Sequence, residues 1–223
     1  MNNFFITGTD TGVGKTWVTL GLMANRQASG LAVNGMKPVA SGSERHGGKL
    51  RNADASLIQA QSSGSPAYER VCPYTFAEPI APHIAAGKLR VEVDPDKVSA
   101  AFDELDRTAD LVVVEGIGGW RVPLSDELQT EHLVRRLNLS VVLVVGLRLG
   151  CINHALLSAE AIQASGLPFA GWLANSICPD YAEQRATLDC LRARIPAPMS
   201  GCIPYLDKLD AETIGASIDL ADP

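Results

Sequence analysis

A short polar segment near the start of the chain has the residue types that bind phosphate. Residues 8–16 read GTDTGVGKT and follow the apolar run Phe4-Phe5-Ile6. Glycines let backbone N–H groups point at phosphate oxygens, and a helix that begins here would add the positive end of its dipole. The lysine can then contact the terminal phosphates, and the threonine hydroxyl can bind Mg²⁺. These residues predict a phosphate-binding loop that ends in Gly14, Lys15 and Thr16.

The spacing of the glycines differs from the common phosphate-loop motif. That motif, G-x-x-x-x-G-K-[ST], has four residues between its glycines, whereas residues 9–13 separate Gly8 from Gly14 here. An ordinary glycine-rich turn between a strand and a helix is the alternative interpretation. The order of strand, loop, Lys-Thr and helix favours phosphate binding over that alternative.

An acidic residue ends a second apolar run, in the stretch LVVVEGIGGW. Glu115 follows the strand-like residues 111–114, and a carboxylate at the end of a buried strand is well placed to bind the metal of a nucleotide enzyme. Acidic residues also follow strands simply as helix N-caps. The phosphate loop favours the metal interpretation, and the glycines at 116, 118 and 119 leave room for phosphates or substrate.

Two further charged residues lie in polar stretches. Asp54, in LRNADASL, could cap a helix or serve as a second carboxylate, because Mg²⁺ needs only one or two. Lys37, in MKPVASGS, ends another strand-like run and is followed by Pro38, which keeps the chain extended. A lysine at a strand end is often only a solvated charge. Beside the phosphate loop it could instead stabilise charge during phosphoryl transfer.

The elements that must position these residues alternate between strand-like and helix-like segments. The continuous apolar runs are typical of a sheet covered on both faces, and the alternation predicts an α/β fold with a mostly parallel sheet and helices on both faces. Ligands of such folds bind beyond the carboxyl ends of the strands. Strands are expected at 4–7, 32–36, 111–114, 141–145 and 169–174, and helices at 15–28, 55–61, 152–165 and 182–194. A further helix is expected to begin at Pro95 with Asp94 as its N-cap, and residues 40–53 are expected to form a long loop.

Composition and charge disfavour several functional classes. The 223 residues are 46% apolar, enough for one core, so we expect a single domain over residues 1–223. The net charge of −6 disfavours a nucleic-acid partner, which calls for a basic face. Five cysteines without a C-x-x-C pair fit a reducing cytosol. No signal peptide is evident, and no apolar run approaches the ~20 residues of a membrane span, so we expect a cytoplasmic protein without a membrane partner.

The histidines and tryptophans suggest no chemistry of their own. His46 lies in the expected loop and is expected to be exposed. His83, His132 and His154 show no metal-ligand spacing with one another, so metal binding by histidine is not expected. The three tryptophans, Trp17, Trp120 and Trp172, are expected in the core or in pocket walls rather than as a stacking platform for nucleic acid.

Taken together, several stretches resemble the dethiobiotin synthetases, the ATP-dependent carboxylases of biotin biosynthesis. That family's pattern TGTDT-x-VGKT includes the longer glycine spacing. Two features depart from it: relatives often have glutamate in place of Gly12, so no role of that glutamate carries over, and the segment after Leu206 matches poorly. The matching stretches run in order over nearly the whole chain: TGTDTGVGKT, KPVASGSE, LRNADA, PYTFAEPIAPH, VVEGIGGW, PLSD, LVVGLRLGCINHA, AGWLANS and IPAP.

The resemblance implies a reaction in which the substrate supplies both nucleophiles. One amine of 7,8-diaminopelargonate takes up CO₂ as a carbamate, and ATP phosphorylates the carbamate to a carbamic-phosphoric anhydride. The second amine then closes a cyclic urea, giving dethiobiotin, ADP and phosphate. No side-chain nucleophile is needed, and the protein must instead control the charge of the phosphoryl group and the carbamate.

The resemblance also implies a role for each matching residue. Lys15, Lys37 and Thr11 would act on the transferred phosphoryl group and the carbamate, and Thr16, Asp54 and Glu115 would bind Mg²⁺. Asn175 would recognise adenine through its amide, although an asparagine that only turns the chain is the alternative. The remaining nucleotide contacts would be Gly12, Val13, Gly14, Trp17, Gly116, Ile117, Gly118, Ser176, Pro204, Tyr205 and Leu206.

The far carboxylate of the substrate needs a separate site. Ser41 would contact the substrate near the phosphates. The turn before residue 152 predicts a helix start, where the free N–H groups of Gly150, Cys151, Ile152 and Asn153 could bind the carboxylate. The family resemblance implies a homodimer in which this helix start reaches the partner's site. The alternative is a helix start whose N–H groups face water.

Two rival functions are less consistent with the sequence. ATPase switches that position chromosomes or septa carry a second lysine five residues before the lysine of G-K-T, in K-G-G-x-G-K-T, and Asp10 occupies that position here. A catalytically dead binding protein would have a damaged loop or lack the metal carboxylate, and both are present.

Overall fold

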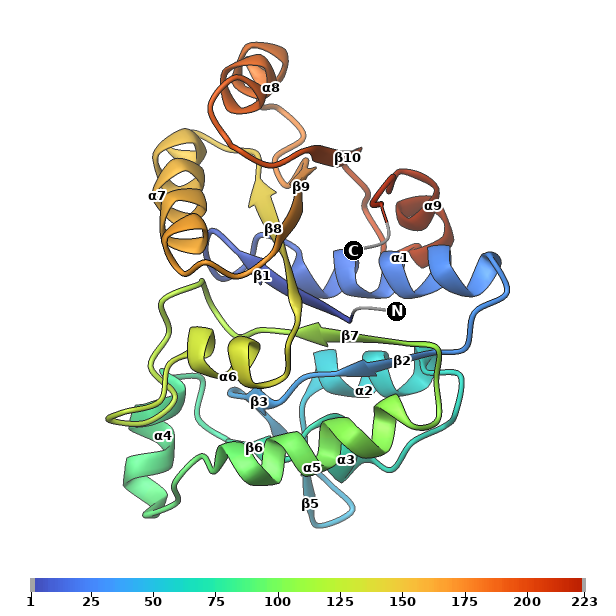
Figure 1. Cartoon of the computed structure of the whole chain (residues 1–223), viewed down its shortest axis with the longest axis vertical. Coiled ribbons are helices and arrows are strands. Elements are labelled where there is room, and N and C mark those ends of the chain that lie inside the picture. The colour runs from blue at the N-terminus through green and yellow to red at the C-terminus, as the bar shows by residue number, and fades with distance from the viewer. Residues whose placement is uncertain (1–2, 222–223) are drawn as a thin grey trace.

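A six-stranded parallel sheet runs through the middle of the molecule (Figure 1). The structure is a computed structural model and describes residues 3–221. The strand order is β10-β9-β8-β1-β7-β2, and each neighbouring pair is parallel, which confirms the predicted fold class. The strands are β1 (Phe4–Gly8), β2 (Val33–Met36), β7 (Leu111–Glu115), β8 (Ser140–Gly146), β9 (Phe169–Asn175) and β10 (Met199–Ile203).

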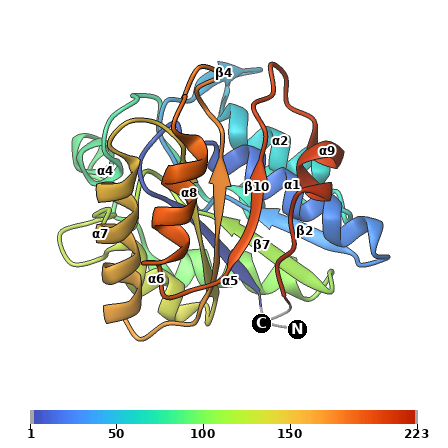
Figure 2. The same ribbon diagram turned by 90° about the horizontal axis from the view of Figure 1, so that it is seen from above.

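Helices cover both faces of the sheet because its strands are apolar on both sides. On β1, Phe5 belongs to one hydrophobic core, whereas Phe4 and Ile6 belong to the other. Figure 2 shows α7 and α8 on one side of the sheet and α1, α2 and α9 on the other. The helices are α1 (Lys15–Ala28), α2 (Ala53–Gln61), α3 (Tyr68–Val71), α4 (Pro82–Leu89), α5 (Pro95–Asp106), α6 (Thr130–Arg136), α7 (Cys151–Ala164), α8 (Gln184–Arg192) and α9 (Ala211–Ala216).

Local signals in the sequence place several helix ends correctly. Helix α1 has the predicted bounds. Helix α5 begins at Pro95, and the Asp94 carboxylate accepts a hydrogen bond from the Asp96 N–H at 2.8 Å, which confirms the predicted N-cap. Helix α8 is shorter than predicted by two residues at each end.

The expectation of a long loop over residues 40–53 is wrong in part, because two short strands lie within it. A short antiparallel hairpin lies there, formed by β4 (Glu44–His46) and β5 (Lys49–Arg51). Gly47 and Gly48 join the strands with φ angles of 58° and 82°, the left-handed conformation that tight hairpin turns require. In the sequence, the adjacent glycines at 47 and 48 were the feature that could have predicted this hairpin turn. A two-residue strand pair, β3 (Val39–Ala40) with β6 (Tyr74–Thr75), adds a second small sheet.

The topology brings four loops to one edge of the sheet. Strands β8, β1, β7 and β2 are consecutive neighbours and parallel, so their carboxyl ends lie side by side. Glu115 is the last residue of β7, and the segments that follow the other three strands contain the predicted phosphate loop, Lys37 and the start of α7. This is the edge at which α/β folds bind ligands.

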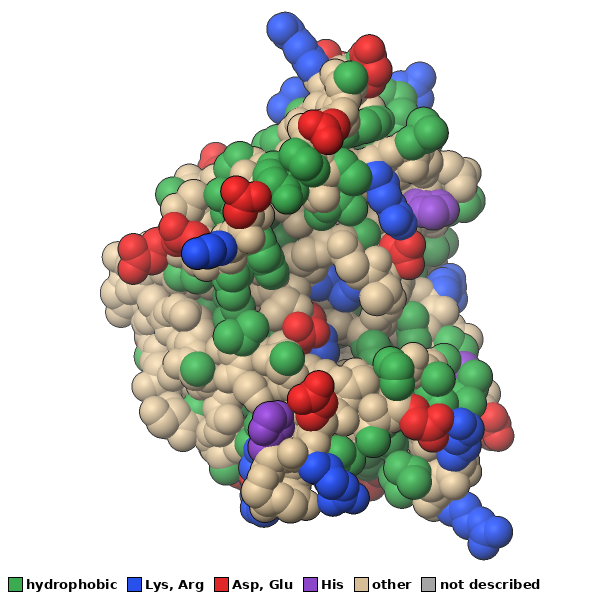
Figure 3. Space-filling model, turned by 180° about the vertical axis from the view of Figure 1, so that it is seen from behind, with side chains coloured by type: hydrophobic (Ala, Val, Ile, Leu, Met, Phe, Trp, Pro, Cys, Tyr) green, Lys and Arg blue, Asp and Glu red, His purple; other side chains and the backbone are tan. Residues whose placement is uncertain are grey.

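The surface shows no basic face on the side seen in Figure 3. Lys and Arg side chains are scattered among Asp and Glu side chains there and form no continuous patch. Within residues 3–221, none of the helices combines the length and the apolar character that a bilayer crossing requires.

Candidate active site

The phosphate loop joins β1 to α1 in a backbone conformation that depends on glycine. Gly12 and Gly14 have φ angles of 74° and 87°. Gly14 is the N-cap of α1, and no side chain caps this helix, so its first N–H groups are available to a ligand. A Cβ on Gly14 would lie 2.0 Å from Nδ2 of Asn175, so a larger residue cannot fit there without moving that side chain.

Lys15 is a buried cation at the end of this loop. Its side chain amine donates to the backbone carbonyl of Asp10 at 2.8 Å, and the residue is only 7% exposed. Burial lowers the pKa of Lys15 to about 8, and the nearby charge of Lys37 adds to the effect, while Glu115 opposes it. An incoming phosphate would favour the charged form, so the cost of burying this ammonium is offset by the ligand.

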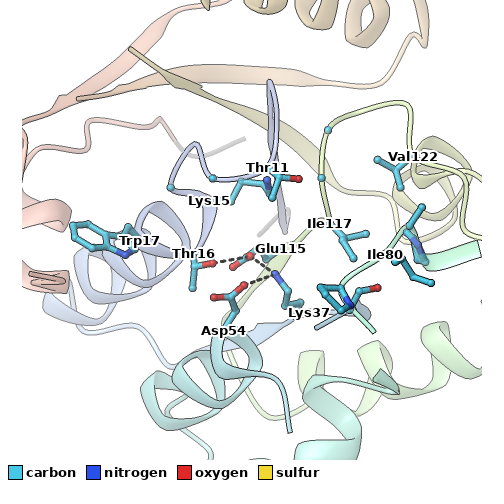
Figure 4. A pocket seen from close by; sticks show the side chains of 18 of the residues that line it. Thr11, Lys15, Thr16, Trp17, Lys37, Asp54, Ile80, Glu115, Ile117 and Val122 are labelled. Atoms are coloured by element: carbon cyan, nitrogen blue, oxygen red, sulfur yellow. Dashed lines mark hydrogen bonds and ion pairs between the residues drawn. The ribbon is translucent and has the colours of Figure 1, made fainter. Parts of the chain in front are cut away.

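Lys37 joins the two predicted metal carboxylates (Figure 4). Its ammonium lies 3.1 Å from Asp54 Oδ2 and also forms an ion pair with Glu115 Oε1. The hydroxyl of Thr16 donates to the same Glu115 oxygen at 3.0 Å. Burial disfavours the ammonium, but the charges of Glu115 and Asp54 outweigh burial and raise the pKa of Lys37. Lys37 therefore stays protonated.

The donor set at this point suits Mg²⁺. Thr16, Asp54 and Glu115 offer only oxygen atoms, which hard divalent cations prefer. Glu115 Oε2 is buried without a hydrogen-bond partner among the described residues, so a carboxylate oxygen remains free for a ligand. Residues 3–221 contain no cluster of three or more His, Cys, Asp or Glu side chains that could hold a metal. A metal here would therefore need phosphate oxygens to complete its shell.

The interpretation of Asp54 as a helix cap is wrong. Asn52 is the N-cap of α2, and its side chain accepts from the Ala55 N–H at 3.2 Å. Asp54 lies in the first turn of the helix and faces Lys37 instead.

A pocket of about 800 Å³ connects these residues to an apolar region. We call Lys15, Thr16, Lys37, Asp54 and Glu115 the polar end. In Figure 4 they lie between Trp17 on one side and the side chains of Ile80, Ile117 and Val122 on the other. We call those last three residues the apolar wall. Among the predicted residues the pocket is lined by Thr11, Gly12, Gly14, Lys15, Thr16, Trp17, Lys37, Ser41, Asp54, Glu115, Ile117 and Gly118.

Several lining residues carried no predicted role. The stretch EPIAPH contains four of them, but short apolar and proline residues there could equally have been core. Gly119, which was expected to leave room for phosphates or substrate, also lines the pocket, and a Cβ on it would lie 3.4 Å from the Gly8 carbonyl oxygen. The residues without a predicted role are Leu57, Pro79, Ile80, Ala81, Pro82 and Val122.

Other predicted nucleotide residues lie outside this pocket. Asn175 ends β9, is 4% exposed, and donates from Nδ2 to the Val13 carbonyl at 3.0 Å. It therefore supports the phosphate loop, and its role toward adenine stays a prediction. Gly116 packs against Phe5, where a Cβ would lie 2.7 Å from the ring. Ser176 follows β9, and Pro204, Tyr205 and Leu206 follow β10.

The helix start at residues 150–153 differs from its prediction in one detail. Gly150 is the N-cap of α7 with a φ angle of 90°, and a Cβ placed on it would meet no atom within 4 Å. The Cys151 N–H is not free, however, because it donates to the Arg148 carbonyl at 3.1 Å. None of the four residues lines the pocket described above.

An ion pair that the sequence did not indicate ties this turn to the phosphate loop. Arg148 Nη2 lies 2.7 Å from Asp10 Oδ2, and the Thr11 N–H donates to Asp10 Oδ1 at 2.7 Å. The hydrogen bond from Thr11, aided by Arg148, holds the pKa of Asp10 below its usual range. Asp10 therefore helps to hold the phosphate loop in place. It occupies the site at which the ATPases that position chromosomes or septa carry their second lysine.

Comparisons with known proteins identify close relatives in sequence and distant ones in structure. A family model described as an AAA domain matches residues 2–213. The ATP-dependent dethiobiotin synthetase BioD of Aromatoleum aromaticum is 48% identical over 97% of this chain and 96% of its own length. The protein of the same name from Pseudomonas aeruginosa strain UCBPP-PA14 is 48% identical over 99% of this chain and 97% of its own.

Among solved structures, the chain resembles the MinC:MinD cell division protein complex of Aquifex aeolicus. The TM-score is 0.57 at 13% identity, over 98% of this chain and 87% of that one. A ParA family ATPase from Chlorobium tepidum gives a TM-score of 0.54 at 14% identity, over 98% and 91%. At such low identity these similarities show a common fold and nothing about activity.

Proposed function

The chain belongs to the ATP-dependent dethiobiotin synthetase family, and from that membership we propose how its own residues carry out the reaction. The protein is a ligase of biotin biosynthesis that uses ATP to form dethiobiotin. In our proposal residues 1–223 act as one domain that carboxylates 7,8-diaminopelargonate with CO₂ and closes the cyclic urea. The observation that carries the proposal is the polar end, where two buried lysines and two carboxylates converge on the phosphate loop.

In this proposal the phosphate loop and Lys15 hold the terminal phosphates of ATP. The free N–H groups at the start of α1 support this assignment, as does the buried ammonium of Lys15. Thr16, Asp54 and Glu115 would hold Mg²⁺, which when bound neutralises charge on the phosphates. Trp17, Asn175, Ser176 and residues 204–206 would contact the nucleoside.

Lys37 and two hydroxyl groups would act on the carbamate. Lys37 keeps its proton because two carboxylates surround it, so it can stabilise the anionic carbamate and the phosphoryl group during transfer. Ser41 Oγ is buried without a hydrogen-bond partner among the described residues, which leaves it available to the substrate. Thr11 lines the same pocket and would contact the transferred phosphoryl group.

The same proposal includes a homodimer with active sites at the interface. Residues 150–153 do not line the pocket of their own chain, which supports a role in the partner's site. Next to them, Leu149 is 91% exposed and Leu157 on α7 is 57% exposed, an apolar surface that a second copy could cover. The N–H groups of Gly150, Ile152 and Asn153 would then bind the far carboxylate. The five free cysteines support a cytoplasmic location.

Mixed dimers would test the shared sites. A Lys15→Ala chain and an Ile152→Pro chain should each be inactive alone, because each damages one part of every site. In a random mixture, one of the two sites in each heterodimer combines both intact parts, so about a quarter of all sites should recover. If heterodimers form and both parents fold, but no activity returns, each site belongs to one chain.

Substrate-dependent ATP turnover tests the function itself. We expect ADP release only when diaminopelargonate and bicarbonate are both present, together with a product of the mass of dethiobiotin. Steady ATP hydrolysis without either compound would contradict the proposal and favour an ATPase switch.

A further inference from the structure

Asn52 is a buried asparagine close to the polar end that takes no direct part in the proposed chemistry. It lies between β5 and α2 and is 6% exposed. Because it does not line the pocket, any effect on the reaction must pass through its neighbours. Two of these neighbours, Ser41 and Asp54, have proposed roles toward the substrate and the metal.

All four polar groups of Asn52 have hydrogen-bond partners. The main-chain N–H donates to the hydroxyl oxygen of Tyr68 at 2.8 Å, and the main-chain carbonyl accepts from the Ser56 N–H at 3.0 Å. The side-chain Oδ1 accepts from the Ala55 N–H at 3.2 Å, and Nδ2 donates to the Ser41 carbonyl at 3.2 Å. The amide fits in one orientation only, because its oxygen meets an N–H group and its nitrogen meets a carbonyl.

The bond from Nδ2 holds the backbone that carries the proposed substrate hydroxyl. It joins Asn52 to the Ser41 carbonyl and so closes the base of the β4–β5 hairpin, residues 42–51. The next residue, Gly42, is tied to a different segment, because its N–H donates to the Glu78 carbonyl at 3.1 Å. The Ser41 hydroxyl is buried without a hydrogen-bond partner among residues 3–221, so its direction depends on these backbone ties.

The bond to Oδ1 holds the first turn of α2. Asparagine is among the preferred N-cap residues, and here it satisfies the Ala55 N–H at the start of the helix. Asp54 lies in this first turn, and its carboxylate faces Lys37 at 3.1 Å (Figure 4). If the turn frayed, the carboxylate would move away from Lys37 and from the proposed metal.

Tyr68 supports Asn52 from the side opposite to the solvent. Its ring is 4% exposed and lies under the guanidinium of Arg51, which is 3.9 Å from the ring centroid. The ring packs in a small hydrophobic cluster that also contains Ala40 and Ala55. These two alanines adjoin the substrate residue and the metal residue in the sequence, so the same cluster supports both sides of the link.

We propose that Asn52 is a positioning residue that fixes the Ser41 hydroxyl and the Asp54 carboxylate relative to each other. The inference rests on the proposed function, from which it takes the roles of these two residues. Through Nδ2 the amide holds the side that meets the carbamate, and through Oδ1 it holds the side that meets the metal of ATP. A residue that only capped α2 would need the oxygen of this amide but not its nitrogen.

Asn52→Ser is the sharpest test, because serine is also a preferred helix cap but has no second polar atom for the Ser41 carbonyl. We expect kcat/KM for diaminopelargonate to fall about three- to tenfold, the scale of one hydrogen bond. The Mg²⁺ concentration at half-maximal rate should stay unchanged, because the cap remains. Asn52→Ala loses the cap as well, so it should also raise the Mg²⁺ requirement.

Asn34→Ser is the matched control, because Asn34 is a buried asparagine with the same kind of bonds outside the pocket. Its Oδ1 accepts from the Gly64 N–H at 3.3 Å, and its Nδ2 donates to the Leu105 carbonyl at 2.9 Å. The substitution should lower the melting temperature, because a buried hydrogen bond is lost. In the folded protein it should leave kcat/KM for diaminopelargonate and the Mg²⁺ requirement at their wild-type values.

A double-mutant cycle tests whether Asn52 acts through Ser41. In a Ser41→Ala protein the hydroxyl is already absent, so adding Asn52→Ser should lower kcat/KM no further. Tyr68→Phe keeps the ring and removes only the acceptor for the Asn52 N–H. It should cause a smaller loss of the same kind, which also disappears in the Ser41→Ala protein.

The outcomes separate this inference from the proposed function. If the wild-type protein does not turn over diaminopelargonate, the proposed function fails. If it does, but folded Asn52→Ser matches wild type, Asn52 only caps α2 and the inference is overturned. An equal loss in Asn34→Ser, or a full further loss in the Ser41→Ala protein, would overturn it as well. Thermal melting shows which variants fold, and if Asn52→Ser does not, Tyr68→Phe decides in the same cycle.

Discussion

The polar end and the apolar wall lie in one pocket but are held in place by different forces. At the polar end the charged side chains hold one another: Lys37 contacts two carboxylates, and Thr16 donates to one of them. At the wall each side chain packs against the hydrophobic core behind it, and none of the three carries a charge. Loss of one residue of the polar end should therefore disturb the others. Substitutions at the wall should have local effects, and the free-energy changes they cause should be nearly additive.

The difference also predicts which kinetic parameter each region controls. The polar end acts on charge that develops during transfer, so its loss should appear mainly in turnover. In the proposed function the substrate's methylene chain does not react, so changes on the apolar side of its pocket should appear mainly in the KM for the substrate.

Lys15→Ala should have the largest effect. Its ammonium is buried at the phosphate loop, and groups aimed at a transition state contribute ~3–4 kcal/mol, or roughly 100- to 1000-fold in rate. Product formation should nearly disappear while the melting temperature stays close to wild type. Lys88→Ala removes a lysine that is 53% exposed and serves as the control. Near-normal turnover by a folded Lys15→Ala protein would remove Lys15 from the mechanism.

Glu115→Gln and Asp54→Ala should each raise the Mg²⁺ concentration needed for activity. Glu115 should have the greater effect because its side chain is 1% exposed, against 44% for Asp54. Binding of Mn²⁺ with ATP, followed by paramagnetic resonance, gives a second readout that does not depend on turnover. If a variant titrates like wild type in both measurements, the substituted residue is not a metal ligand.

Lys37→Ala should lower turnover more than it lowers the affinity for ATP. Its proposed partners are the carbamate and the moving phosphoryl group, which exist only after ATP has bound. Equilibrium binding of ATP and steady-state rates on the same preparation separate the two effects. A loss confined to ATP binding would place Lys37 with the nucleotide and weaken the contrast between the two regions.

The affinity for ATP should fall as pH rises through about 8, by up to about tenfold per unit. Burial lowers the pKa of Lys15 to about 8, so above that pH the ligand-free protein loses the charge that the phosphates need. ATP binding must then take up a proton, which weakens binding as pH rises. Binding isotherms from pH 7 to 9.5 would show the slope, and Lys15→Arg should remove it. A flat profile for wild type would mean that Lys15 stays charged throughout.

Residues at the polar end could be recognised from the sequence because their chemistry prescribes their types. Only a lysine followed by a hydroxyl residue fits the end of a phosphate loop, and only an acidic residue fits the end of the strand at Glu115. Their meeting follows from the order of the parallel strands β1, β7 and β2. The apolar runs indicated a parallel sheet, but they did not indicate this order. The contact between Lys37 and Asp54 could not be predicted, because it joins the segment after β2 to the first turn of α2 across a hairpin that was missed.

The apolar wall could not be predicted because its residue types are also those of the core. Isoleucine and valine fill both, and only the folded chain shows which ones face a cavity. The same limit applies to hydrogen bonds inside loops. The N–H of Cys151 looked free at a helix start, but it donates to Arg148 within the preceding turn.

An oxygen-transfer experiment tests most directly the claim that the substrate, and not a side chain or water, attacks ATP. The enzyme is supplied with ¹⁸O-labelled bicarbonate in unlabelled water, ATP and diaminopelargonate, and the released phosphate is analysed by mass spectrometry. The carbamate oxygen that bonds to phosphorus stays with phosphate when the second amine closes the ring. The account predicts about one ¹⁸O atom in phosphate per dethiobiotin formed, because only one carbamate oxygen attacks. Phosphate that gains its oxygen from water instead would contradict it.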